Sequence, residues 1–332
     1  MIIYGGKYYS DDGQTFGPYT HELQKLAKSP KDRGHLAGER VATTMRPIFH
    51  VLDLSKRGIG IFQQLKIEEA LFRADKSNRN WLILNSLGSV RERAVVFGLG
   101  DGRKPHKLCN VDLARADGIP LIKRYTGGGT VFVDDGTRFI TFICNDNILA
   151  DSTAQDGIAN KDLLLNSPRP IMKWTGDLYK GAFDKIFKAY GKSQIQDNGE
   201  EMQRNRNLFD LRENDYIFDK RKFGGNAQSI SKNRWVHHTS FLYDFDVSLM
   251  SKYLFLPEKQ PEYRDHRDHD SFLCKMKDIF PETAPPVALE EALLEVLGRR
   301  NFNLKFMNDE NAFDSIQEII NQDGYRQSNV LL

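Results

Sequence analysis

A run of three glycines between two strand-like stretches constrains this sequence more than any other feature. It lies in PLIKRYTGGGTVFVDDGTRFITF, residues 120–142. Glycine weakens a strand because it loses the most backbone entropy on ordering and has no side chain to pack. Gly127, Gly128 and Gly129 therefore indicate either a hairpin turn or a place where a ligand lies against bare backbone.

The residues around the glycines favour an anion as that ligand. Successive amides without Cβ atoms can turn inward and form a nest for negative charge. Arg124 precedes the glycines, and its planar guanidinium suits a carboxylate or a phosphate. The spacing matches neither the P-loop nor the Gly-x-Gly-x-x-Gly dinucleotide fingerprint, so neither of those nucleotide folds is indicated.

The pattern of apolar residues predicts an α+β fold, with a mixed or antiparallel sheet and helices packed on it. Helical periodicity runs through residues 59–75, 176–191 and 287–299, and 110–118 forms a short helix capped by Asn110 or Asp112. We expect a further helix over 271–280, with Asp270 near its positive end. Strand-like runs occur at 80–86, 94–100, 120–125, 130–133, 138–144, 215–230, 234–246 and 302–306. Residues 147–175 and 191–207 resemble polar insertions.

Length and composition favour one catalytic domain with smaller additions in a chain of 332 residues. We expect an N-terminal extension (1–56), a catalytic domain (57–250) and a short C-terminal helical extension (251–332) without a full accessory domain. The net charge of +2 argues against a nucleic-acid partner. No apolar run approaches the roughly 18 residues that span a bilayer, so we expect no membrane partner.

Two features of the sequence bear on the cellular compartment of the protein. Three scattered cysteines favour a reducing environment. Residues 1–56 carry basic and hydroxyl side chains typical of a transit segment, although Asp11, Asp12 and Glu22 interrupt them. We expect a mitochondrial protein with a cytoplasmic alternative, and a monomer.

A second glycine-bearing element lies in residues 213–242. Lys222 precedes a Gly-Gly-Asn and offers a point charge for a phosphate or an acyl carbonyl, although a lone lysine in a turn is more often solvated. Asn214 and Asp215 suit a ribose, an amine or a metal-bound phosphate. His237 and His238 must face opposite ways on a strand, and we expect His238 to face the site.

Four collinear motifs now resemble those of lipoate–protein ligases and their octanoyl- and lipoyl-transferase relatives. KRYTGGGTVFVDDG (123–136) resembles the family's Arg-x-Ser-Gly-Gly-Gly-x-Val-Phe-His-Asp signature. LKIEEALF (65–72) resembles its first helix, ENDYIFDKRKFGGNAQ (213–228) its Asn-Asp and Lys-x-x-Gly-x-Ala element, and WVHHTSFL (235–242) its histidine strand. The resemblance runs from about Ile59 to Asp246.

The resemblance implies the class II aminoacyl-tRNA synthetase-like fold shared with biotin protein ligases. It also implies a reaction in which ATP, with Mg²⁺, and lipoate give lipoyl-AMP. The acyl group then moves to a lysine of a lipoyl domain, on a 2-oxoacid dehydrogenase or the glycine cleavage H protein. Lipoate or lipoyl-AMP would be the small-molecule substrate.

The resemblance also places the site. Lys222 would be the catalytic residue, at the acyl carbonyl and phosphate, and Mg²⁺ would arrive with ATP near Asp215. Residues that bind the substrate and nucleotide would be Arg124, Thr126, Gly127, Gly128, Gly129, Thr130, Val131, Phe132, Asn214, Asp215, Gly225, Ala227 and His238.

Departures from the family pattern leave the reaction open. Val133 stands where the family has histidine, Thr137 where it has asparagine, and Thr239-Ser240 where it has Gly-Thr. Three activities therefore remain: a ligase acting through acyl-AMP, an ATP-independent transferase taking the acyl group from a carrier protein or lipoyl domain, and a relative that only binds. We expect Cys144 to be structural, and the His/Asp/Cys group in residues 265–274 to cap a helix and not to bind a metal.

Overall fold

The computed structural model describes residues 46–86, 92–149, 167–191, 209–307, 309–321 and 328–331. It also gives the backbone of three short N-terminal strands, β1 (Ile3–Tyr4), β2 (Lys7–Tyr9) and β3 (Thr15–Phe16). Most of the expected transit segment and most of the two expected polar insertions lie outside the described residues.

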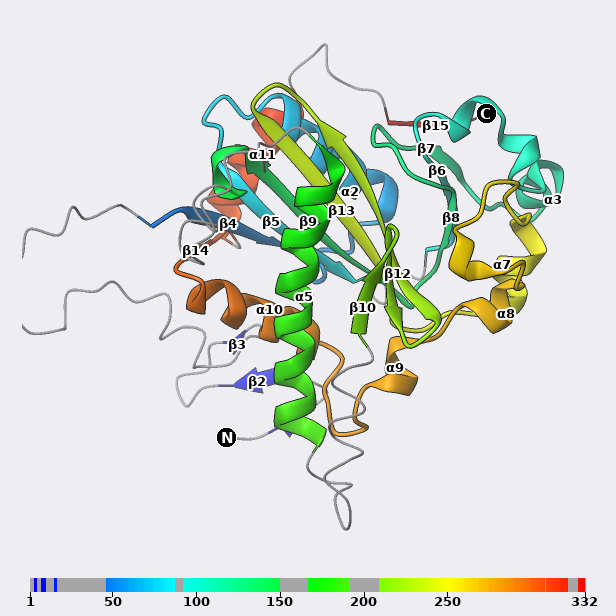
Figure 1. Cartoon of the computed structure of the whole chain (residues 1–332). Helices are drawn as coiled ribbons and strands as arrows, with labels where there is room; N and C mark the ends of the chain where they lie inside the picture. The colour runs from blue at the N-terminus through cyan, green and yellow to red at the C-terminus, as the bar shows by residue number, and fades with distance from the viewer. Residues whose placement is uncertain are drawn as a thin grey trace, which may run out of the picture.

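A mixed sheet of eight strands forms the centre of the molecule (Figure 1). Neighbouring strands are antiparallel except that β4 runs parallel to both β5 and β14. Helices cover its two faces, so the predicted α+β class is confirmed. In spatial order the strands are β10 (Phe209–Arg212), β11 (Asp215–Phe218), β12 (Arg221–Ile230), β13 (Arg234–Leu242), β9 (Thr137–Asn145), β5 (Asn80–Ser86), β4 (Ile48–Asp53) and β14 (Asn303–Phe306).

A smaller sheet of four strands lies beside the central one (Figure 1). Its order is β15 (Asn329–Val330), β7 (Leu121–Lys123), β6 (Ala94–Phe97) and β8 (Val131–Val133). The glycine run connects β7 to β8, but β6 lies between these two strands and pairs with both. The glycines therefore do not form a hairpin turn; their loop crosses the end of β6.

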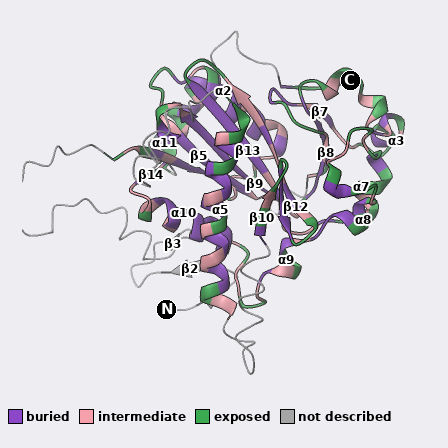
Figure 2. Ribbon diagram, viewed as in Figure 1, coloured by how far each residue is buried: buried purple, intermediate pink, exposed green. Residues whose placement is uncertain are grey.

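Buried residues follow the strands of the central sheet and the helices beside it (Figure 2). Their apolar side chains form one core on each face of the sheet. One face packs against α5 (Pro168–Tyr190) and α10 (Ala288–Arg299), and the other against α2 (Ile61–Arg73) and α11 (Glu310–Ile320). Along β13, Trp235 faces α5 while Val236 faces α2, as the alternation of a strand requires.

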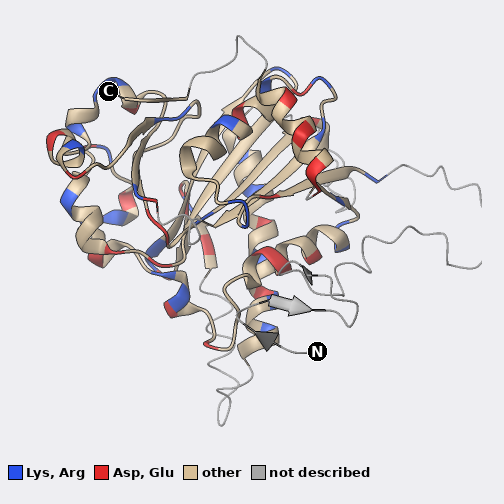
Figure 3. Cartoon of the chain, turned by 180° about the vertical axis from the view of Figure 1, so that it is seen from behind, with Lys and Arg blue, Asp and Glu red and all other residues tan. Residues whose placement is uncertain are grey.

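Short helices pack around the small sheet and the nearby end of the central one. They are α3 (Val111–Ala116), α7 (Val247–Tyr253), α8 (His269–Phe272) and α9 (Met276–Ile279), with the 3₁₀ helices η3 (Asp101–Arg103), η4 (Pro105–Lys107) and η7 (Glu262–Arg264). Basic and acidic residues are interspersed along these elements (Figure 3). In the described part of the chain, no helix is both long and apolar enough to cross a bilayer.

The helix α5 begins at Pro168, eight residues before the expected start, so the expectation of an irregular insertion over residues 168–175 is wrong. Proline favours the first helical position because its missing N–H has no helical partner there. Ile171, Met172 and Trp174 are buried on the face toward the sheet. Burial of these three side chains against the sheet stabilises the extra helical turns over residues 168–175.

Residues 271–280 form parts of two short helices, α8 and α9, and not the one helix expected. The N–H of Cys274, between them, donates to the carbonyl of Lys222 on β12 (2.9 Å), so the chain leaves the helical path to pair with the sheet. The capping residue of α8 is Asp268, whose carboxylate accepts from the Ser271 N–H (2.9 Å), and Asp270 lies in the first turn, near the positive end of the helix as expected.

The central sheet crosses both domain boundaries expected from the sequence. β4 precedes residue 57 and β14 follows residue 250, yet these strands pair, with Asn303 opposite Ile48. α10 also shares one hydrophobic core with α5. Within the described residues, positions 56 and 250 therefore do not separate structural units.

Gly136 offers a test of the packing between the two sheets. It lies in the turn from β8 to β9, and a Cβ there would lie 2.1 Å from the carbonyl oxygen of Asp244. We expect Gly136→Ala to lower the free energy of unfolding by about 1–3 kcal/mol, because the backbone must shift. Gly191→Ala is the control, since nothing lies within 4 Å of a Cβ there. Chemical denaturation measures the free energy of unfolding of both variants. An equal change in the two would contradict this packing.

Candidate active site

The glycine loop is held against β12 of the central sheet. The N–H of Gly127 donates to the carbonyl of Gln228 (3.0 Å). Gly128 has φ +99°, and a Cβ there would lie 3.1 Å from the carbonyl oxygen of Asn226. On the other side, a Cβ on Gly98 would lie 2.0 Å from the carbonyl oxygen of Gly128. Close approach of three backbone segments therefore requires glycine at both 98 and 128.

Arg124 is buried beneath this loop. Its guanidinium donates to the carbonyl oxygens of Val96 (3.3 Å), Gly127 (3.0 Å) and Gly129 (2.7 Å). Burial lowers the pKa of Arg124 to about 10, opposed by the negative charges of Asp101 and Glu68, so the residue stays charged at neutral pH. The guanidinium braces the loop here, and its expected contact with a carboxylate or phosphate stays a prediction.

Lys222 forms an ion pair with Asp215. The Lys222 Nζ lies 2.7 Å from Asp215 Oδ1. Asp215 pairs with Gly225 across β11 and β12, and a Cβ on Gly225 would lie 3.3 Å from this Nζ. The other Asp215 oxygen, Oδ2, accepts a hydrogen bond from the hydroxyl of Tyr263 (2.8 Å). The ammonium group is therefore held over a glycine and lines the same cavity as the glycine loop.

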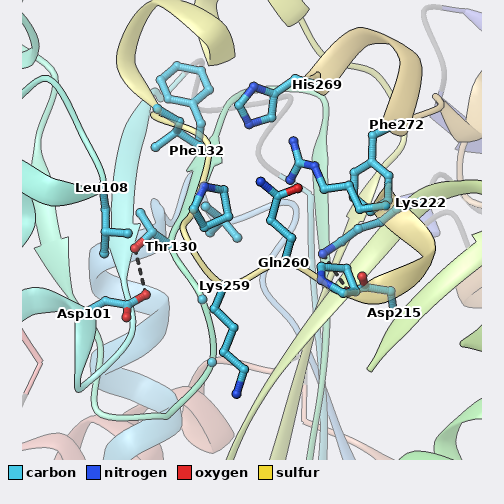
Figure 4. Close-up of a pocket in the computed structure, with 18 of the residues that line it drawn as sticks. Asp101, Leu108, Thr130, Phe132, Asp215, Lys222, Lys259, Gln260, His269 and Phe272 are labelled. Carbon is cyan, nitrogen blue, oxygen red and sulfur yellow. Dashed lines mark hydrogen bonds and ion pairs between the residues drawn. The ribbon is translucent and has the colours of Figure 1, made fainter. Parts of the chain in front are cut away.

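Two cavities meet at Lys222. The first, about 430 Å³, has an apolar wall formed by Ile61, Val96, Val131, Val133, Phe139, Met172 and Ala227. The second, about 710 Å³, lies between the glycine loop and residues 250–273 and carries more polar and charged side chains. Figure 4 shows a pocket in which Asp101 and Thr130 lie on one side and Lys222 and Asp215 on the other.

Most of the residues expected in the site line one or both cavities. Those lining both are Gly128, Gly129, Thr130, Val131, Asn214, Asp215, Lys222 and Gly225. Arg124, Gly127, Ala227 and His238 line only the first cavity, and Phe132 only the second. Thr126 lines neither; its hydroxyl is buried without a hydrogen-bond partner.

The sequence analysis missed two groups of residues. The first is the apolar wall around Ile61, Phe139 and Met172, which resembles ordinary core in the sequence. The second is the C-terminal segment carrying Tyr263 and Arg264, which lies outside the four motifs. Two signals marked this segment in the sequence. One is the density of charged residues and histidines around 262–270, and the other is a Pro-x-Tyr-Arg…His…Phe-Leu run over 261–273 that resembles eukaryotic relatives of the family.

The two histidines of β13 lie on opposite faces. His238 faces the first cavity, and its Nδ1 lies 2.9 Å from Oε2 of Glu68, a fully buried carboxylate on α2. Thr141 donates to the same carboxylate (2.8 Å). His237 lies in the core beneath α5, and burial lowers its pKa to about 3.

The structure does not support a metal held at Asp215. Both Asp215 oxygens accept hydrogen bonds from protein groups, one of them the Lys222 cation. Among the described residues, no three His, Cys, Asp or Glu side chains form a group suited to a metal ion. The expectation of Mg²⁺ near Asp215 therefore does not fit direct coordination by this carboxylate.

All three cysteines are buried, at Cys109, Cys144 and Cys274. Burial raises the pKa of the Cys144 thiol well above its usual value and those of Cys109 and Cys274 to about 11. A thiolate nucleophile is therefore not favoured at any of them.

A family model for the lipoyl protein ligase A/B catalytic domain matches residues 60–298. A Plasmodium falciparum (isolate 3D7) protein named "Inactive lipoate–protein ligase 2" is 29% identical over 264 residues, which is 69% of this chain and 64% of that protein. The chain therefore spans less than two thirds of that relative's length.

Solved structures of lipoate–protein ligases share the fold. A lipoate–protein ligase A bound with ATP aligns with 84% of this chain and 95% of its own (TM-score 0.53, 15% identity). A putative lipoate protein ligase from T. acidophilum with bound lipoic acid aligns with 82% and 94% (TM-score 0.52, 15% identity).

The buried His237 predicts a pH dependence of stability. Its pKa is about 3 in the folded chain against an ordinary 6.5, so the unfolded state binds more protons between these values. The stability that neutral His237 contributes is fully present above pH 6.5 and is lost as the pH falls toward 3. Between pH 7.5 and 5.5 we expect the free energy of unfolding to fall by about 1 kcal/mol more in the natural protein than in His237→Gln. The free energy of unfolding is measured by denaturant titration at the two pH values. Equal decreases for the natural protein and His237→Gln would contradict a lowered pKa at His237.

Proposed function

This chain belongs to the lipoyl protein ligase A/B catalytic-domain family, and we propose that it attaches a lipoyl group to a lysine of a lipoyl domain through an acyl-AMP intermediate. The observation that carries the proposal is the position of Lys222. Its ammonium, held by Asp215, lies where a cavity with an apolar wall meets a larger one that carries more charged side chains.

This geometry suits an acyl adenylate. The cavity of about 430 Å³ accommodates the acyl chain along its apolar wall, and the cavity of about 710 Å³ accommodates the nucleotide; both lie in the size range of small-molecule sites. The acyl carbonyl and phosphate then lie between Lys222 and the backbone of the glycine loop. Val133, which replaces the family's histidine, is 1% exposed and belongs to the apolar wall.

Transfer to an amine builds negative charge on the carbonyl oxygen and then on the departing phosphate. A fixed ammonium and preorganised loop amides stabilise such charge by a few kcal/mol in a site that excludes water. The attacking group is the acceptor lysine, so no nucleophilic side chain is needed from this chain. We propose ATP and lipoate as the substrates that form the adenylate, and lipoyl domains of 2-oxoacid dehydrogenases or the glycine cleavage H protein as acceptors.

Binding without catalysis is a second candidate, favoured by the name of the P. falciparum relative, which calls that protein inactive. An ATP-independent transferase acting through a cysteine is disfavoured, because all three thiols are buried and have raised pKa values. Lys222, Asp215 and the three glycines of the loop, the groups that the proposed transfer uses, are all present.

A two-arm transfer assay distinguishes these activities. One arm contains the protein, a lipoyl domain, lipoate and Mg-ATP; the other contains octanoyl carrier protein without ATP. We expect mass spectrometry to show a modified acceptor lysine in the first arm only. Modification in the second arm alone supports the transferase. No modification of several acceptors, together with measurable binding of lipoyl-AMP, supports the binding-only relative.

Lys222→Ala tests the role of the central cation. We expect acyl transfer to fall by about 100-fold or more, because the developing charge loses its fixed ammonium. Lys220→Ala is the matched control: this exposed lysine lies two residues away in the turn and lines neither cavity. Equal activities of the two variants, at unchanged thermal stability, would exclude Lys222 from catalysis.

A further inference from the structure

Arg264 is a buried cation whose side chain is not fully paired. It lies in η7, outside the four sequence motifs, and only 6% of its surface is exposed. Its Nε donates to the carbonyl of Arg267 (2.9 Å), and its guanidinium lies 4.5 Å above the ring of Phe272. Nη2 is buried without a hydrogen-bond partner, although the residue lines the larger cavity. An unpaired buried N–H of a charged group is costly, so a ligand that accepts a hydrogen bond from Nη2 would be stabilised here.

The nearby carboxylate does not satisfy Arg264. Asp215 attracts the guanidinium electrostatically, but its oxygens are hydrogen-bonded to Lys222 (2.7 Å) and Tyr263 (2.8 Å). Asp268 also attracts the guanidinium and Arg267 repels it, so three cations (Lys222, Arg264 and Arg267) face two carboxylates (Asp215 and Asp268). The local excess of one positive charge favours an anion.

The rest of the cavity wall does not remove this excess. Its other charged side chains are Lys104, Lys107, Lys259, Asp101, Glu213 and Glu258, and His269 also lines it. The wall therefore carries five cations and four carboxylates in all. Burial and the neighbouring Arg264 both lower the pKa of His269, which is neutral at pH 7 and leaves the balance unchanged.

The segment carrying Arg264 is fastened to the catalytic strands at two points. The hydroxyl of Tyr263 donates to Asp215, and the N–H of Cys274 donates to the carbonyl of Lys222 (2.9 Å). Both contacts involve the Lys222–Asp215 pair. Arg264 is therefore placed by the same groups that position Lys222. Figure 4 shows His269 and Phe272 of this segment on the pocket wall.

We infer that Arg264 binds a phosphate group together with Lys222. This inference rests on the proposed function, under which the phosphate is that of the bound acyl adenylate. A guanidinium stacked on an aromatic ring keeps its N–H edge free, and that edge matches two phosphate oxygens in a way that an ammonium does not. Residues 261–274 thereby complete the nucleotide side of the site.

Ligand titrations test the inference without relying on catalysis. The affinities of AMP, adenosine, pyrophosphate and lipoate are measured by isothermal titration calorimetry. The variant is Arg264→Met, and the control is Arg221→Met, which removes an exposed arginine that lines neither cavity. We expect Arg264→Met to weaken AMP about tenfold or more and to leave adenosine and lipoate within twofold. Arg264→Lys keeps the positive charge but loses the planar guanidinium. We expect its AMP affinity to lie between those of the natural protein and of Arg264→Met.

The outcomes separate this inference from the proposed function. An unchanged ratio of AMP to adenosine affinity in Arg264→Met overturns the inference, and retained acyl transfer by the natural protein then leaves the proposed function intact. A loss confined to pyrophosphate also overturns the assignment to the adenylate. Unchanged lipoate binding by Arg264→Met shows that the variant is folded. An equal loss of AMP affinity in Arg221→Met attributes the effect to general charge and overturns the inference.

Discussion

Three backbone carbonyls, those of Val96, Gly127 and Gly129, accept hydrogen bonds from the buried guanidinium of Arg124, and these bonds hold the glycine loop where it crosses β6. Burial of this cation is tolerated because it is hydrogen-bonded and faces the charges of Glu68 and Asp101. Glu68 also binds His238, so one buried network joins α2, β13 and the loop.

Each of the two sheets positions a different part of the site. The central sheet places Lys222 and Asp215 on neighbouring strands, and the small sheet brings the glycine loop within hydrogen-bond distance of β12. The C-terminal segment adds Tyr263 and Arg264 on the remaining side. The two cavities therefore meet where all three parts of the chain approach the ammonium of Lys222.

The substitution of Val133 for histidine is compatible with this arrangement. The residue packs with Ile61, Val96 and Phe139 in one apolar cluster, so its position demands an apolar side chain. The polar contact expected from the family pattern is absent, while the ion pair of Lys222 and the bracing by Arg124 are intact. Valine in place of histidine at this wall of the cavity therefore leaves the ion pair of Lys222 and Asp215 unchanged.

The sequence alone determined the fold class, the family resemblance and the motif residues that line the cavities, because strand alternation, glycine runs and capping residues are local signals. Tertiary structure decided the rest. Only strand order shows that the loop beside Gly128 crosses β6, and only packing shows that Arg124 braces that loop. The extra turns of α5, the break at Cys274 and the place of Arg264 all depend on contacts with distant strands, which no local pattern encodes.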